Sequence, residues 1–179
     1  MRPILMSYAW TDKPIDSISA DASMDHWDTF NNFTASHAIE LLGPGKSSYN
    51  LRLACEELFS NIVRHAGSLS GPSDVKITVD VFKNNLSQTE DTTHADKSAA
   101  IMVQISDTGP FFDPHFQTPR TIENDLSVAD RPIGGLGLFL VQQSVDRAEY
   151  AWVNDKNRYR LYINNQPLPE SAGNQATSS

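Results

Sequence analysis

A carboxylate, a carboxamide and a guanidinium follow one another along one amphipathic segment. Glu57 and Asn61 stand four residues apart, and Arg64 follows three residues later, so on a helix the three side chains share one face. The amide oxygen of Asn61 suits Mg²⁺, which prefers oxygen ligands. Glu57 could accept a proton from a nucleophile, and Arg64 could neutralise a phosphate. Taken alone, the same spacing also describes an ordinary solvated helix face.

Asp107 and Gly109 directly follow a run of alternating aliphatic residues. A carboxylate at the end of the strand that this run predicts could accept a hydrogen bond from an exocyclic amine such as that of adenine. The glycine lets the backbone come close to a flat ring. An ordinary Asp-Gly turn has the same letters, and this alternative stays open on these residues alone.

A second glycine-rich stretch, Gly134-Gly135-Leu136-Gly137, stands immediately before an apolar helix. Free N–H groups at a helix start favour an anion such as a phosphate. The stretch matches neither the P-loop pattern nor the dinucleotide pattern, so those two nucleotide-binding folds are disfavoured. The other interpretation is a flexible entry to a core helix.

Hydrophobic periodicity predicts the elements that must position these residues. Helices are expected over 24–41, 51–66 (with Gly67 as a C-terminal cap) and 138–145, and strands over 15–22, 75–81, 101–105, 148–153 and 158–163. In this order, the strands after the first come in hairpin pairs, and the helices are separate from these pairs. We therefore expect an α+β fold: a two-layer sandwich whose mixed, mostly antiparallel sheet carries the helices on one face.

The remaining segments divide the chain into one domain and its extensions. Residues 1–15 are expected to form a flexible arm, 16–165 the domain, and 166–179 a disordered tail. Inside the domain, the polar segment 83–99 predicts a long hairpin loop. The proline-rich segment 110–133 predicts a lid, because a stretch of this length without a period is typically functional or disordered.

Composition narrows the class of protein further. The 179 residues carry a net charge of −8 and have a pI near 4.9, which disfavours sequence-independent nucleic-acid binding. The single cysteine, Cys55, cannot form an internal disulfide. No apolar run approaches the length of a membrane span. We expect a cytoplasmic protein with no membrane contact.

In order and spacing, the three stretches resemble the Bergerat ATP-binding fold of histidine-kinase-like ATPases, and most closely the bacterial anti-sigma factor serine/threonine kinases. Glu57-Leu-Phe-Ser-Asn61-Ile-Val-Arg-His65-Ala66 resembles their N-box. Asp107-Thr-Gly-Pro-Phe-Phe-Asp-Pro114 resembles their first glycine box, and Gly134-Gly-Leu-Gly-Leu-Phe-Leu-Val141 the second. The resemblance spans about residues 16–165.

The resemblance implies a role for each matched residue. Asn61 is expected to coordinate Mg²⁺ between the ATP phosphates, and Glu57 to act as the general base. Asp107 is expected to bind the adenine amine, with Gly109 beside the ring. The residues implied around the phosphates are Arg64, Arg131 from the lid, Gly134, Gly135, Leu136 and Gly137.

The implied function is an anti-sigma regulatory factor that binds Mg·ATP and phosphorylates a serine or threonine of an antagonist protein. Its implied partners are that antagonist, a sigma factor and a second copy of the chain in a homodimer, without direct nucleic-acid binding. Three alternatives remain at this stage: a non-catalytic ATP-binding switch, a detached histidine-kinase catalytic domain, and an interaction domain with a vestigial nucleotide site.

Overall fold

The computed structural model describes residues 10–69, 74–84, 99–118 and 135–164. Its helices are the one-turn η1 (Met24–His26), α1 (Trp27–Leu42), α2 (Lys46–Leu69) and α3 (Gly135–Ser144). Its strands are β1 (Asp16–Asp21), β2 (Lys76–Lys83), β3 (Ala99–Asp107), β4 (Arg147–Val153) and β5 (Lys156–Asn164).

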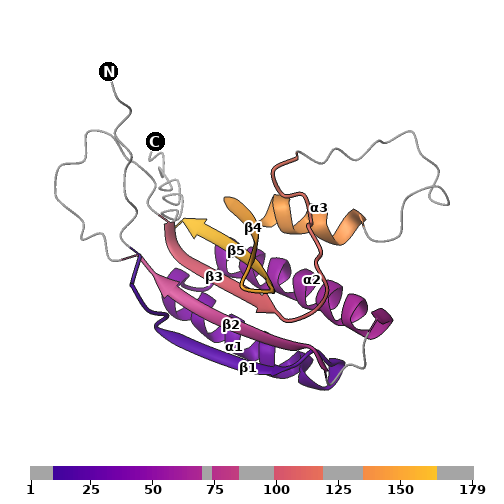
Figure 1. Ribbon diagram of the computed structural model, residues 1–179. Coiled ribbons are helices and arrows are strands. Elements are labelled where there is room, and N and C mark those ends of the chain that lie inside the picture. The colour runs from indigo at the N-terminus through magenta and orange to yellow at the C-terminus, as the bar shows by residue number, and fades with distance from the viewer. Residues whose placement is uncertain (1–9, 70–73, 85–98, 119–134, 165–179) are drawn as a thin grey trace, which may run out of the picture.

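The strands form a single sheet in the order β1-β2-β3-β5-β4. Every pair of neighbours is antiparallel. Figure 1 shows the helices gathered on one face of this sheet. The expected two-layer α+β sandwich is confirmed. The expectation of a mixed sheet was too broad for the described strands, since all of them are joined antiparallel.

The core lies between the sheet and the helices. Val79 and Val81 on β2 are fully buried, as their alternation with polar residues requires for a strand with one covered face. The rings of Phe30 on α1 and Phe59 on α2 stack 5.0 Å apart and join the two helices above the sheet. Cys55 is buried beside them on α2.

Helix α2 is longer than its hydrophobic stripe predicts. It begins at Lys46, after Gly45, whose N–H donates to the Ser48 hydroxyl. The helix continues through Leu69, so the expectation that Gly67 ends it was wrong. A glycine inside a helix costs only about 1 kcal/mol relative to alanine, which the packing of a long amphipathic helix readily outweighs.

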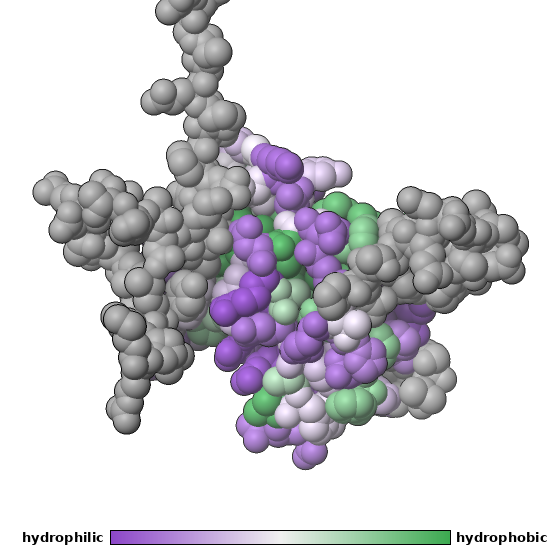
Figure 2. All heavy atoms as spheres, turned by 90° about the horizontal axis from the view of Figure 1, so that it is seen from above, coloured by the Kyte–Doolittle hydropathy of each residue, from purple (hydrophilic) through white to green (hydrophobic). Residues whose placement is uncertain are grey.

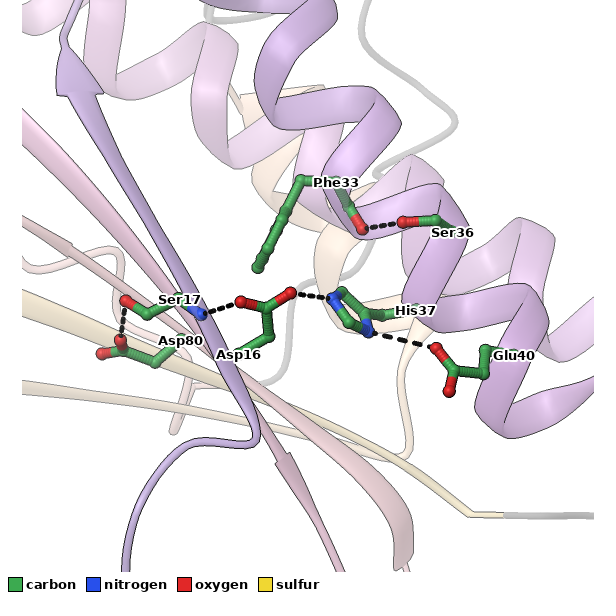
Figure 3. Close-up of polar contacts among 7 residues, drawn as sticks. All are labelled: Asp16, Ser17, Phe33, Ser36, His37, Glu40 and Asp80. Atoms are coloured by element: carbon green, nitrogen blue, oxygen red, sulfur yellow. Dashed lines mark hydrogen bonds and ion pairs between the residues drawn. The ribbon is translucent and has the colours of Figure 1, made fainter.

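Edge strand β1 is tied to α1 by a polar cluster, which Figure 3 shows. The His37 ring on α1 lies with Nε2 2.9 Å from Oδ2 of Asp16 and with Nδ1 3.6 Å from Oε2 of Glu40. Phe33 packs edge-on against the same ring, with the centroids 4.8 Å apart. The hydrogen bonds from Ser17 N–H and His37 lower the pKa of the Asp16 carboxyl.

The residues just before β1 lie beside the C-terminal end of β2. Thr11 N–H donates to the Lys83 carbonyl, and the Trp10 ring packs 5.7 Å from the Tyr162 ring on the open face of the sheet. The rest of the expected arm, 1–9, the tail, and most of the predicted loop 83–99 and lid 110–133 lie outside the described residues.

In the part of the chain that the structure describes, no helix combines the length and apolar character needed to cross a bilayer. Seen from above, the described surface carries hydrophobic residues as small separate patches among hydrophilic ones (Figure 2).

Candidate functional site

Helix α2, which carries the N-box-like stretch, and the first glycine box, Asp107–Pro114, meet at one pocket. About 330 Å³ of empty space, including the open mouth, lies between α2, the segment after β3 and the start of β5. The lining residues are Leu58, Asn61, Ile62, His65, Asp107, Gly109, Pro110, Phe112, Asn157 and Tyr159. Residues that are 46 positions apart in the chain, Asn61 and Asp107, therefore share one cavity.

The second glycine stretch packs directly on the polar face of α2. A Cβ atom placed on Gly137 would lie 2.5 Å from Oε2 of Glu57 and 3.6 Å from Nδ2 of Asn61. Only a residue without a side chain lets the first turn of α3 approach the Glu57 carboxylate this closely, whereas 3.6 Å from Asn61 is an ordinary contact distance. The start of α3, Glu57 and Asn61 thus form one continuous site.

Asn61 is buried, with 6% of its surface exposed. Its Oδ1 accepts a 3.4 Å hydrogen bond from Nη1 of Arg64, and a guanidinium can only donate, so the oxygen faces the arginine. Its Nδ2 is buried and has no hydrogen-bond partner among the described residues. A buried polar atom without a partner is costly, and it points to a ligand that completes the site.

Arg64 lies on the rim rather than in the pocket. Its guanidinium is exposed and is held by Asn61 and by the Ser60 hydroxyl, which accepts from Nη2 at 3.1 Å. The structure therefore brings Arg64 to Asn61, as the helical spacing predicts. From this position the arginine orients the amide of Asn61 and adds positive charge at the edge of the site.

Asp107 ends β3 inside the pocket and is 3% exposed. Its Oδ1 accepts two hydrogen bonds, from Gly109 N–H at 2.8 Å and from Nδ2 of Asn157 at 2.9 Å. Its Oδ2 is buried and lacks a well-formed hydrogen bond within the described part of the chain, although the Tyr159 hydroxyl lies near the carboxylate. The oxygen left over is an acceptor for a ligand amine or hydroxyl.

Burial has the largest effect on the pKa of this carboxyl group. Desolvation raises the pKa of Asp107, while the hydrogen bonds from Asn157 and Gly109, the nearby Tyr159 hydroxyl and the nearby His65 lower it, and the net shift is upward. The same surroundings raise the pKa of the Tyr159 hydroxyl, through burial first and then the charge of Asp107. Loss of any of these donors would therefore raise the pKa of Asp107 further.

Gly109 closes the turn after Asp107 so tightly that no side chain fits. A Cβ at this position would lie 2.8 Å from Oδ1 of Asp107 and 3.4 Å from Cγ1 of Val75. Because Oδ1 is already held by two hydrogen bonds, it has little freedom to move away. The glycine that sequence reasoning placed beside a ligand ring is thus required by the protein's own packing.

An aromatic pair that sequence reasoning did not assign to the site forms one side of the pocket. The rings of His65 on α2 and Phe112, after the first glycine stretch, lie 4.3 Å apart and are tilted by 32°. In the sequence, His65 and Phe112 stand out only as members of the N-box-like stretch and the first glycine box. Their contact joins α2 to the segment after β3, and no sequence signal predicts it.

Asn157 is the second residue that the sequence did not single out. The polar run Asn154-Asp155-Lys156-Asn157 is typical of a turn between two strands, but the turn itself is narrower. Asn154 and Asp155 adopt φ of 52° and 58°, and Asn157 already belongs to β5, opposite Asp107. Only the register between β3 and β5 reveals that this side chain reaches the pocket.

The structure describes only some of the remaining predicted site residues. Gly135 is the first residue of α3, and Leu136 beside it is 61% exposed. Gly134 and Arg131 lie outside the described residues. Their assignment to the phosphates stays a prediction.

The pocket lies between a helix and an Asp-x-Gly turn at the end of a strand, and a glycine-rich helix start completes it. In an antiparallel two-layer domain, this arrangement has the form of a nucleotide-binding domain. The family model described as the histidine kinase-like ATPase domain matches residues 20–163, which is most of the chain. The chain belongs to this histidine kinase-like ATPase domain family, whose ligand is ATP. A comparison with curated proteins found none that matches the chain.

Proposed function

We propose that this chain is an ATP-dependent protein kinase of the anti-sigma factor type, which transfers the γ-phosphoryl group of ATP to a serine or threonine of an antagonist protein. One observation carries the proposal: the Glu57 carboxylate stands against Gly137 in the first turn of α3, beside the buried amide of Asn61. A potential base therefore lies where free helix N–H groups can receive phosphates.

The pocket residues fit ATP and Mg²⁺ by their chemistry. One buried polar atom, Nδ2 of Asn61, lacks a partner among the described residues, and Oδ2 of Asp107 has no well-formed hydrogen bond there. Gly137 lets the first turn of α3 approach Glu57 beside Asn61. Asp107 would accept from the base amine, and the oxygen of Asn61, which keeps a second lone pair, would be a ligand for Mg²⁺. When bound, Mg²⁺ supplies charge neutralisation at the phosphate oxygens.

In the proposed reaction, Glu57 accepts the proton of the acceptor hydroxyl. The hydroxyl oxygen forms a bond to the γ-phosphorus, and the bond from that phosphorus to the β–γ bridging oxygen breaks, so ADP leaves with the electron pair. Positioning and charge neutralisation supply most of the rate, as in phosphoryl transfer generally. Arg64 at the rim adds positive charge near the developing negative charge.

The assignment to the anti-sigma type is supported by the first glycine box. The sequence Gly109-Pro-Phe-Phe-Asp-Pro114 resembles that group, and two of its residues are used structurally: Phe112 packs on His65, and Pro114 is buried. A sigma factor, an antagonist and a second copy of the chain are the partners that this assignment proposes.

The test compares two adjacent glutamates. Glu57→Ala should keep ATP binding, measured by calorimetry, while transfer of labelled γ-phosphate to candidate antagonist proteins falls by at least about 100-fold, a usual contribution of a general base. Glu56→Ala is the matched control, because Glu56 lies one residue away and pairs with Arg52 at 3.9 Å instead of facing Gly137.

The two variants separate the outcomes. Equal transfer by Glu57→Ala and the unaltered protein would remove Glu57 as the base. ATP binding by the unaltered protein without transfer to any antagonist would favour a non-catalytic switch, and phosphate found on a partner histidine would favour a histidine-kinase domain.

A further inference from the structure

Asn157 uses every hydrogen-bonding position that a carboxamide has. Its Nδ2 donates to Oδ1 of Asp107 at 2.9 Å and to the Pro110 carbonyl at 2.8 Å. Its Oδ1 accepts from Phe112 N–H at 3.0 Å and from the Tyr150 hydroxyl at 3.0 Å. A carboxamide has two N–H donors and two oxygen lone pairs, so this set leaves none for a ligand.

The partners also settle which way the amide points. The Pro110 carbonyl can only accept, and the Phe112 N–H can only donate, so a reversed amide would lose both bonds. The side chain is 1% exposed, and therefore water cannot replace lost partners without entering the pocket wall. One buried side chain thus holds one orientation through four separate attachments.

Three of the four attachments lie on two parts of the pocket wall. One is the carboxylate of Asp107, whose Oδ1 is occupied by Asn157 and Gly109 and whose Oδ2 has no well-formed bond in the described region. The other is the backbone from Pro110 to Phe112, where the Phe112 ring packs on His65. The fourth attachment is the hydroxyl of Tyr150 on edge strand β4, which donates a hydrogen bond to the Asn157 amide oxygen.

We propose that Asn157 is a positioning residue of the nucleotide site, which occupies Oδ1 of Asp107 so that Oδ2 receives the base amine, and which holds the Pro110–Phe112 wall against α2. The inference rests on the proposed nucleotide binding, and it adds a residue that acts on the ligand through Asp107. The bond from Asn157 also favours the ionised carboxylate, which burial opposes.

The first test needs no ligand. The carboxyl carbon of Asp107 is followed by NMR during a pH titration of the ligand-free protein. Asn157→Ala removes a donor to the carboxylate, so the titration midpoint should move to higher pH. Asn157→Ser, which leaves a hydroxyl and room for water, serves if the alanine variant fails to fold, and the same upward shift is expected.

The second test measures affinity. ATP binding by calorimetry should weaken by about tenfold or more in Asn157→Ala or Asn157→Ser, the usual cost of a misdirected buried hydrogen bond. Tyr150→Phe is the matched control: it removes one of the four bonds to Asn157 but none to Asp107, so the titration midpoint and the affinity should stay near those of the unaltered protein.

The outcomes distinguish this inference from the proposed function. A folded Asn157 variant with an unchanged Asp107 titration and unchanged affinity would overturn the positioning role, and so would an equal loss of affinity in Tyr150→Phe. If the unaltered protein binds no ATP, the proposed function fails, while the ligand-free titration still decides whether Asn157 controls Asp107.

Discussion

Replacing Gly137 by alanine should separate folding from catalysis. The new Cβ would lie 2.5 Å from Oε2 of Glu57, so the carboxylate must retreat by about 1 Å to reach an ordinary contact. The atom it meets is the far end of a flexible side chain, and therefore the fold can adjust. Alanine also favours a helix over glycine by up to about 1 kcal/mol.

The expected result is a stable protein with a displaced base. The melting temperature should be unchanged or slightly raised, since the gain in helix propensity offsets the local rearrangement. A displacement of about 1 Å at a reacting group can cost about 100-fold in rate. Phosphoryl transfer should fall by about that factor, while the affinity for ATP changes much less, because the Cβ stays at an ordinary 3.6 Å from Nδ2 of Asn61.

The assay combines thermal unfolding, calorimetric ATP binding and single-turnover transfer of labelled γ-phosphate. Gln143→Ala, on an exposed position of the same helix, controls for changes in α3 itself. In the double variant with Glu57→Ala, the loss should not exceed that of Glu57→Ala alone, because Gly137→Ala acts through that carboxylate. Wild-type transfer by Gly137→Ala, or additive losses in the double variant, would refute the reasoning.

Further predictions concern three buried or paired groups, Asp107, Asp16 and Cys55. Asp107→Asn can keep both bonds at Oδ1 but turns the other acceptor, Oδ2, into a donor, so ATP affinity should fall by about 10- to 100-fold. Because burial raises the pKa of Asp107 above its ordinary value of 3.8, ionisation costs folding free energy as pH rises through that interval. The asparagine variant should therefore lose this pH dependence and unfold no more easily at pH 7, as urea titrations can check. The pKa of Asp16 is lowered, so its ionised form stabilises the fold above about pH 4, and this contribution is lost as the pH falls further. The free energies of unfolding of Asp16→Asn and the unaltered protein, measured by urea titration, should therefore differ at pH 7 and converge near pH 2. Burial raises the pKa of the Cys55 thiol, so a disulfide reagent should label it only as fast as the protein unfolds, and rapid labelling of native protein would contradict its core position.

Local pattern was sufficient for most elements of this fold. The alternation of Val79 and Val81 with polar residues predicts a strand, and the stripe through Cys55 and Leu58 predicts a helix, because burial of one face imposes a period on the chain. The end of α2 was predicted wrongly at Gly67, since local propensity is weaker than the packing of a long helix.

For the site, the sequence determined the chemical groups and their order: Glu57 and Asn61 one helical turn apart, Asp107 before Gly109, and Gly137 at a helix start. Only the tertiary structure decided that Gly137 of α3 contacts Glu57 and that the His65 ring packs on Phe112. It also decided that Asn157 forms hydrogen bonds with Asp107 and with the adjacent backbone from Pro110 to Phe112. These contacts depend on strand register and on the approach of elements distant in sequence. Such geometry leaves no period or spacing in the chain, because each partner is set by the packing of the whole domain.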